Sequence, residues 1–230
     1  MSPLLPTATF LFLTLLASAQ SDAAALLEEA RTTLNEKSLN DARTSFQQLP
    51  QKDAAYFYYA LARVDSYRST AAQLRHDKKA ASVALDQAID EAQQALKVDD
   101  HSATAHALLG DLYGQKIGLG AGMMLGARFG PKIVAENKRA LELDPNNPRV
   151  LASLGRQYLF APKMFGGDID KSIDNFKKST ELDPKSDETF VWLALAYRKK
   201  GDAASATKAV NQALSLNPRS LFAQNTKAGK

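Results

Sequence analysis

The side chains best suited to metal chemistry gather in one short segment. Asp99, Asp100 and His101 are consecutive, and His106 follows five residues after His101. Carboxylate and imidazole groups are common metal ligands, but this spacing matches no standard metal-binding motif. Asp100 and His101 also fall in an expected turn between two helices. The sequence therefore predicts no metal site, and His106 is expected to lie in a helical core.

Patterns typical of catalysis are absent from the sequence. It contains no Gly-x-Ser-x-Gly elbow, no phosphate-binding Gly-rich loop ending in Gly-Lys-Ser/Thr and no His-Glu-x-x-His pair. It also contains no cysteine, which excludes disulfides, thiolate metal sites and cysteine nucleophiles. We predict that the protein is not an enzyme and uses no cofactor.

The net charge of +4 is concentrated near the C-terminus. Seven basic and three acidic residues follow position 186, a difference of four, so the preceding residues are neutral in sum. Nucleic-acid binding needs lysine and arginine clustered on one face, which this weakly basic end does not provide. We therefore predict no nucleic-acid partner.

A recurring six-residue pattern shows which elements must position any functional side chains. ALELDP, STELDP and ALSLNP end at Pro145, Pro184 and Pro218, and ALKVDD ends at Asp100 in the same context. The intervals are 45, 39 and 34 residues, which equal one 34-residue unit with insertions of 11, 5 and none. Proline stops a helix, so each pattern predicts the end of a helical unit. Repeats of this length form stacked helical hairpins.

The chain resembles the tetratricopeptide repeat (TPR) family. The family's signature positions hold small residues followed by tyrosine: Gly110 and Tyr113, Gly155 and Tyr158, Ala194 and Tyr197. The resemblance implies an all-α TPR solenoid, a right-handed superhelix of about five helical pairs over residues 20–220. Insertions enlarge the middle units, and a short C-terminal tail over residues 221–230 is expected to fray.

The pattern is weaker before residue 100. Two helical pairs are expected there, and the second has the longer helices. Its aromatic run, Tyr56 to Tyr59, covers every side of one helical turn. We interpret this run as core with one exposed tyrosine, rather than as a ligand cage.

The first insertion places a glycine at every fourth position, at Gly114, Gly118, Gly122, Gly126 and Gly130. Each glycine inside a helix costs about 1 kcal/mol relative to alanine, so some other interaction must offset this loss. We expect tight packing against a neighbouring helix; the alternatives are a ligand-groove wall and self-association along the stripe. A helix break is expected at Gly118–Gly120, and the next helix is expected to begin at Pro131.

The second insertion, Pro162 to Gly166, lies between the two helices of its unit. Gly166 and Gly167 permit positive φ, and Asp168 can cap the following helix. The apolar residues Phe160, Met164 and Phe165 are expected to tuck the loop onto the solenoid, the alternative being a hook for a partner.

The two insertions also carry a family resemblance and an alternative function. Together they are similar to exported or membrane-tethered TPR proteins of the regulator-of-microtubule-dynamics-like group and to TPR components of some TRAP transporters. The alternative is a ligand-binding accessory protein. Its apolar pocket would be lined by Met123, Met124, Phe129 and Phe165.

The family resemblance implies that partners bind the concave face, lined by the first helix of each pair. The phasing places five candidate side chains there: Asp111, Arg149, Arg156, Glu188 and Arg198. Asp111 and Arg156 stand where the family's chaperone-tail clamp requires asparagine, so that clamp is absent. Arg149 and Arg156 lie two turns apart on one face and could hold an acidic peptide. We predict a scaffold that binds a partner protein or peptide.

The N-terminus reads as an export signal. Phe10 to Ala17 is a short apolar run, and Ala17-Ser18-Ala19 fits the small-x-small rule for signal peptidase. The sequence predicts a signal peptide over residues 1–19, cleaved before Gln20, and an extracytoplasmic (periplasmic or secreted) protein without a membrane span. Retention of the segment as an anchor and burial of the segment as a helix of the fold are the alternatives.

Overall fold

The structure, a computed structural model, describes residues 7–49, 54–120 and 123–229, and within these ranges it contains helices and no strand. The helices are α1 (Thr7–Thr33), α2 (Glu36–Gln48), α3 (Ala54–Leu74), α4 (Lys78–Val98), α5 (Ala103–Leu119), α6 (Met123–Leu143), α7 (Pro148–Phe160), the 3₁₀ turn η1 (Lys163–Phe165), α8 (Ile169–Leu182), α9 (Asp187–Lys200), α10 (Ala203–Leu216) and α11 (Leu221–Lys227). No helix among the described residues has both the length and the apolar character needed to cross a membrane.

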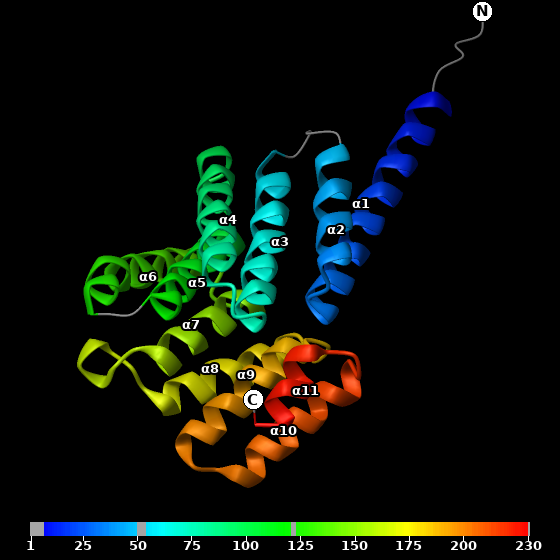
Figure 1. Cartoon of the computed structure of the whole chain (residues 1–230). Coiled ribbons are helices and arrows are strands. Elements are labelled where there is room, and N and C mark those ends of the chain that lie inside the picture. The colour runs from blue at the N-terminus through cyan, green and yellow to red at the C-terminus, as the bar shows by residue number, and fades with distance from the viewer. Residues whose placement is uncertain (1–6, 50–53, 121–122, 230) are drawn as a thin grey trace, which may run out of the picture.

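The helices stack as five consecutive pairs, from α1–α2 to α9–α10 (Figure 1). This arrangement confirms the predicted all-α TPR solenoid of about five pairs. The expectation of a frayed tail is wrong, because residues 221–227 form α11 and bury Ala223 and Thr226. The last pair would otherwise expose its apolar face, and α11 covers that face.

Capping side chains fix where the helices begin. Each N-cap side chain accepts backbone N–H groups of the first turn, at Asn35, Asp77, Ser102, Asn147, Asp168, Ser186, Asp202 and Ser220. Such a cap contributes about 1 kcal/mol, so the short turns between helices are set locally by sequence.

Small residues let the two helices of a pair approach closely. A Cβ atom at Gly155 in α7 would lie 2.6 Å from the ring of Phe176 in α8, which is fully buried. The hydroxyl of Ser172 in α8 also donates to the carbonyl of Gly155 at 2.8 Å. The signature glycine is therefore required by packing rather than by backbone conformation.

The glycine-rich insertion differs from expectation in two ways. The break after α5 is confirmed, with Gly120 as its C-cap, but α6 begins at Met123 and continues through Pro131, so the predicted boundary at Pro131 is wrong. The longer helix buries Phe129, whose ring stacks on Tyr113 with centroids 5.3 Å apart. Burying an aromatic side chain is worth a few kcal/mol, comparable with the cost of proline inside a helix.

The prediction that the glycine stripe packs tightly against a neighbouring helix is also wrong for the glycines of the stripe that the structure describes. Added Cβ atoms at Gly114, Gly118, Gly126 and Gly130 would meet nothing within 4 Å. Gly122 lies outside the described residues.

The second insertion is ordered but does not tuck onto the solenoid. Gly166 adopts a φ of 87°, and a Cβ atom at Gly167 would lie 1.8 Å from the carbonyl oxygen of Ala161. These two glycines permit the tight turn before Asp168 caps α8. Met164 and Phe165 are 83% and 66% exposed, so the expectation that they cover the solenoid is wrong.

The solenoid curves until its first helix reaches its last pair (Figure 1). Arg31 in α1 donates to both carboxylate oxygens of Asp187 in α9, at 2.7 and 3.2 Å. The amide of Asn217, which follows α10, donates to the hydroxyl of Thr32 at 3.1 Å. We call these two interactions the closing contact. Burial lowers the pKa of Arg31, but the hydrogen bond with Asp187 and the charges of Glu188 and Glu28 together raise it more, so the guanidinium stays charged.

A second buried ionic group joins α2, α3 and α4. Arg43 lies 2.5 Å from Asp65 and 2.8 Å from Glu91, and Arg68 lies 3.3 Å from Asp65. Oε2 of Glu91 has no hydrogen-bond partner among the described residues. Burial, opposed by Arg43 and assisted by the charge of Asp65, raises the pKa of Glu91 from 4.5 to about 7.

Substituting Gly155→Ala should destabilise the fold, since the new methyl group clashes with a ring that has no room to move. We expect the free energy of unfolding to fall by about 1–3 kcal/mol. The matched control Gly114→Ala places a methyl group in open space and should raise it by up to about 1 kcal/mol. Urea denaturation measures both, and shifts of the same sign and size would contradict the packing argument.

The stability of the protein should fall as the pH rises from 4.5 to about 7. In this window the folded protein retains the proton of Glu91 while the unfolded chain releases it, so folding is coupled to proton uptake. Glu91→Gln removes this titration and should flatten the dependence of the melting temperature on pH. Asp86→Asn, at an exposed carboxylate, is the control, and equal slopes for the two variants would refute the assignment.

Candidate functional site

The concave face contains an open hollow of about 460 Å³. Its walls come from α1, α3 and α7, together with the end of α4 and the beginning of α5. The side chains that give it chemical character are Glu28, Tyr56, Tyr59, Arg63, Asp99, Thr104 and Arg149. Both α1 and α7 line this hollow, so it depends on the curvature that the closing contact maintains.

One wall of the hollow is aromatic. Tyr56 packs edge-on against the buried Phe46, with ring centroids 6.2 Å apart, and its centroid lies 6.5 Å from that of Tyr59. Tyr56, Tyr59 and Arg63 are spaced i, i+3 and i+7 on α3, so they share one helix face. This wall can contact apolar groups with its rings and polar groups with its hydroxyls.

The hollow contains two arginines, Arg63 and Arg149, and two carboxylates, Glu28 and Asp99. Arg63 donates to the hydroxyl of Tyr67 at 3.2 Å and lies 3.6 Å from Glu28, whose side chain is half exposed. Burial lowers the pKa of Arg63, but electrostatic interactions with Tyr67, Tyr59 and Glu28 outweigh burial and raise it. Arg149 donates to the hydroxyl of Tyr59 at 3.3 Å and forms no ion pair with a carboxylate among the described residues. A guanidinium with free donors is suited to binding a carboxylate.

The other candidate arginine on the concave face is already engaged. Arg156 forms a two-pronged ion pair with Asp111, at 2.9 and 2.5 Å, and its guanidinium lies over the ring of Trp192. The hydroxyl of Ser153 donates to the same carboxylate at 2.8 Å. The sequence predicted that Arg149 and Arg156 bind an anion together. In the structure Asp111 already occupies Arg156, so of these two arginines Arg149 alone has no ionic partner among the described residues.

The remaining two candidates, Glu188 and Arg198, lie in the first and last turns of α9. Glu188 is half-buried and close enough to raise the pKa of Tyr67, whose burial is the larger cause. Arg198 is exposed in the last turn of α9 and does not line the hollow.

Sequence reasoning missed the α3 side of the site. The run Tyr56 to Tyr59 was expected to be core, yet Tyr56 and Tyr59 line the hollow together with Arg63. The i, i+3, i+7 spacing of Tyr56, Tyr59 and Arg63 was a signal in the sequence that these three side chains share one face of a helix. The repeat pattern is too weak before residue 100 to show which face of α3 is concave.

The apolar pocket of the alternative function does not form from the residues expected. Phe129 is buried against Tyr113, whereas Met124 is 85% exposed and Phe165 is 66% exposed. These three side chains therefore line no common enclosed cavity, and the side chain of Met123 lies outside the described structure.

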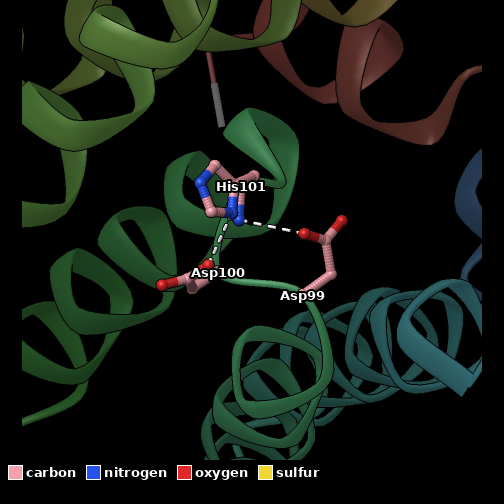
Figure 2. Close-up of side chains that lie close together, drawn as sticks. All are labelled: Asp99, Asp100 and His101. Atoms are coloured by element: carbon pink, nitrogen blue, oxygen red, sulfur yellow. Dashed lines mark hydrogen bonds and ion pairs between the residues drawn. The ribbon is translucent and has the colours of Figure 1, made fainter.

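The carboxylates and imidazole at the turn between α4 and α5 do lie together (Figure 2). Ligand atoms of Asp99, Asp100 and His101 fall within 4.8 Å of one another, and all three residues are exposed. The backbone N–H of His101 donates to Asp99 at 3.0 Å, and its ring lies 2.6 Å from Asp100. Hydrogen bonds within the turn account for this arrangement. Both ring nitrogens of His106 have other partners: Nδ1 lies 2.6 Å from Glu136, and Nε2 lies 3.0 Å from the backbone carbonyl oxygen of Asp100.

Antiparallel helical pairs that stack around a concave hollow define a TPR solenoid. The chain belongs to the Regulator of microtubule dynamics protein 1-3 family, whose model matches residues 23–228. None of the curated protein sequences matches the chain.

One solved structure supports the fold, and a second is reported as a similarity only. The TPR protein TTC0263 of Thermus thermophilus is similar to this chain with a TM-score of 0.67 and 16% identity, over 93% of this chain and 97% of its own. YrrB, described as a TPR protein with an unusual peptide-binding site, has a TM-score of 0.44 and 16% identity, over 94% of this chain and 97% of its own.

Proposed function

We propose that this protein is an exported scaffold, not an enzyme, that holds an acidic segment of a partner protein in its concave hollow. The observation that carries this proposal is the combination of Arg63, Arg149 and the tyrosine wall around about 460 Å³ of space. An extended peptide can place a carboxylate on the arginines and an apolar side chain on the rings.

The unpaired guanidinium of Arg149 favours an acidic occupant. Arg63 already lies 3.6 Å from Glu28, and the arginines outside the hollow, Arg31 and Arg156, are paired with the buried Asp187 and the half-buried Asp111. A bound carboxylate would therefore meet the free donors of Arg149. A basic segment would leave Arg149 without an ionic partner in a partly desolvated space, which is costly.

Export is supported by the N-terminal sequence and is compatible with the fold. Cleavage before Gln20 would leave the part of α1 that carries the buried residues Ala23, Leu27 and Ala30. It would also leave Arg31, and thus the closing contact, intact.

Selection of a random peptide library on the full chain should enrich sequences containing Asp or Glu beside an apolar residue. Binding of a selected peptide should weaken at least about tenfold in Arg149→Ala, as expected for the loss of a charge-assisted hydrogen bond. Arg198→Ala, an exposed arginine outside the hollow, is the control. Enrichment without acidic residues, or equal affinity of the two variants, would overturn the proposal.

Mass spectrometry of the protein isolated from producing cells should show a chain that begins at Gln20. Ala19→Arg places a large cation at the cleavage position and should yield the uncleaved chain. A wild-type protein that retains its first nineteen residues would show that the apolar segment is not a cleaved signal.

A further inference from the structure

Both enlarged turns of the solenoid lie on one edge. Because α5 and α7 pack side by side and the helices alternate in direction, the α5–α6 and α7–α8 turns are neighbours. Helices α6 and α8 both end just before an Asp-Pro pair, but α6 has 21 residues and α8 has 14. The start of α6 therefore projects about 10 Å beyond the start of α8. We call the edge formed by these turns and the α9–α10 turn the turn edge.

The turn edge exposes large apolar side chains. Met124 at the start of α6 is 85% exposed, and Phe160, Met164 and Phe165 around η1 are 65%, 83% and 66% exposed. The segment that carries the last three is held in place. Gly167 N–H donates to the carbonyl of Pro162 at 3.0 Å, and the ring of Phe160 packs on Trp192 with centroids 5.9 Å apart. Clusters of exposed apolar groups on an ordered surface mark interaction sites.

Cations surround these apolar groups. Exposed basic residues on the turn edge are Arg128, Lys132, Lys163, Lys171, Lys199 and Lys200, against the carboxylates of Asp168, Asp170 and Asp202. The opposite edge has more carboxylates than cations near its turns: Asp99, Asp100, Glu142, Asp144, Glu181 and Asp183, against the exposed Lys97, Arg149 and Lys185. The pairs that the cations make, such as Lys200 with Asp170 at 2.7 Å, are exposed and therefore weak.

The geometry points to the turn edge as a docking surface for an anionic lipid bilayer. Met164 and Phe165 enter the interface between headgroups and acyl chains, and Lys163 and Arg128 contact lipid phosphates. Each lysine or arginine near an anionic membrane surface strengthens binding about fivefold. The apolar groups project from a turn, which suits a fluid surface better than a rigid protein groove.

Charge also disfavours a second copy as the occupant. A symmetric dimer formed through the turn edge would bring two positive surfaces together, and juxtaposed like charges are repulsive. A bilayer containing anionic lipid instead offers the complementary charge.

The full chain can be tested by flotation with phosphatidylcholine vesicles, with and without about 30% phosphatidylglycerol. We expect binding to the anionic vesicles only, weakened by salt. The double substitutions Met164→Ser with Phe165→Ser, and Arg128→Glu with Lys163→Glu, should each lower the partition coefficient at least about tenfold. Val98→Ser and Lys185→Glu change exposed residues near the opposite edge and should leave it within about twofold.

The single tryptophan reports which surface faces the membrane. Trp192 contacts Phe160, so brominated lipids should quench its fluorescence in the bound state. Three outcomes would overturn the inference: no flotation of the wild type, flotation that the double substitutions leave unchanged, and flotation without quenching, which would indicate binding through the N-terminal segment. Loss of a dimer by sedimentation in these variants, without loss of flotation, would assign the surface to a second copy.

Discussion

The ion pair between Arg31 and Asp187 joins the first helical pair to the fifth. A TPR unit contacts only its neighbours along the solenoid, so stacking alone leaves the two ends unconnected. The closing contact adds a partly buried, charge-assisted bond between residues 156 positions apart, and breaking such a pair costs several kcal/mol. It fixes the curvature that brings α1, α3 and α7 around one hollow.

The same curvature divides the molecule into surfaces with different chemistry. The hollow combines tyrosine rings with two arginines and two carboxylates, and Arg149 forms no ion pair there among the described residues. The turn edge is outside the hollow and combines exposed methionine and phenylalanine with lysine. Function can therefore be assigned to each surface separately, because substitutions on one surface leave the side chains of the other in place.

The two insertions illustrate how local sequence and tertiary packing compete. Proline at position 131 favours a helix start, and local preference alone would place one there. Burial of Phe129 against Tyr113 extends α6 by two turns instead. The glycine stripe suggested a buried contact, yet its described positions face open space. In both cases the outcome depends on a partner helix that local patterns do not reveal.

The sequence by itself determined the helical pairs, their caps and their order, because proline, capping residues and small residues act within one unit or between adjacent units. It also indicated that Arg149 lies on the concave face. Only the tertiary structure decided that Arg156 is occupied by Asp111, that Tyr56, Tyr59 and Arg63 complete the site, and that Met164 and Phe165 are exposed. These features arise from contacts between distant units, whose geometry depends on the accumulated curvature of the solenoid rather than on any single repeat.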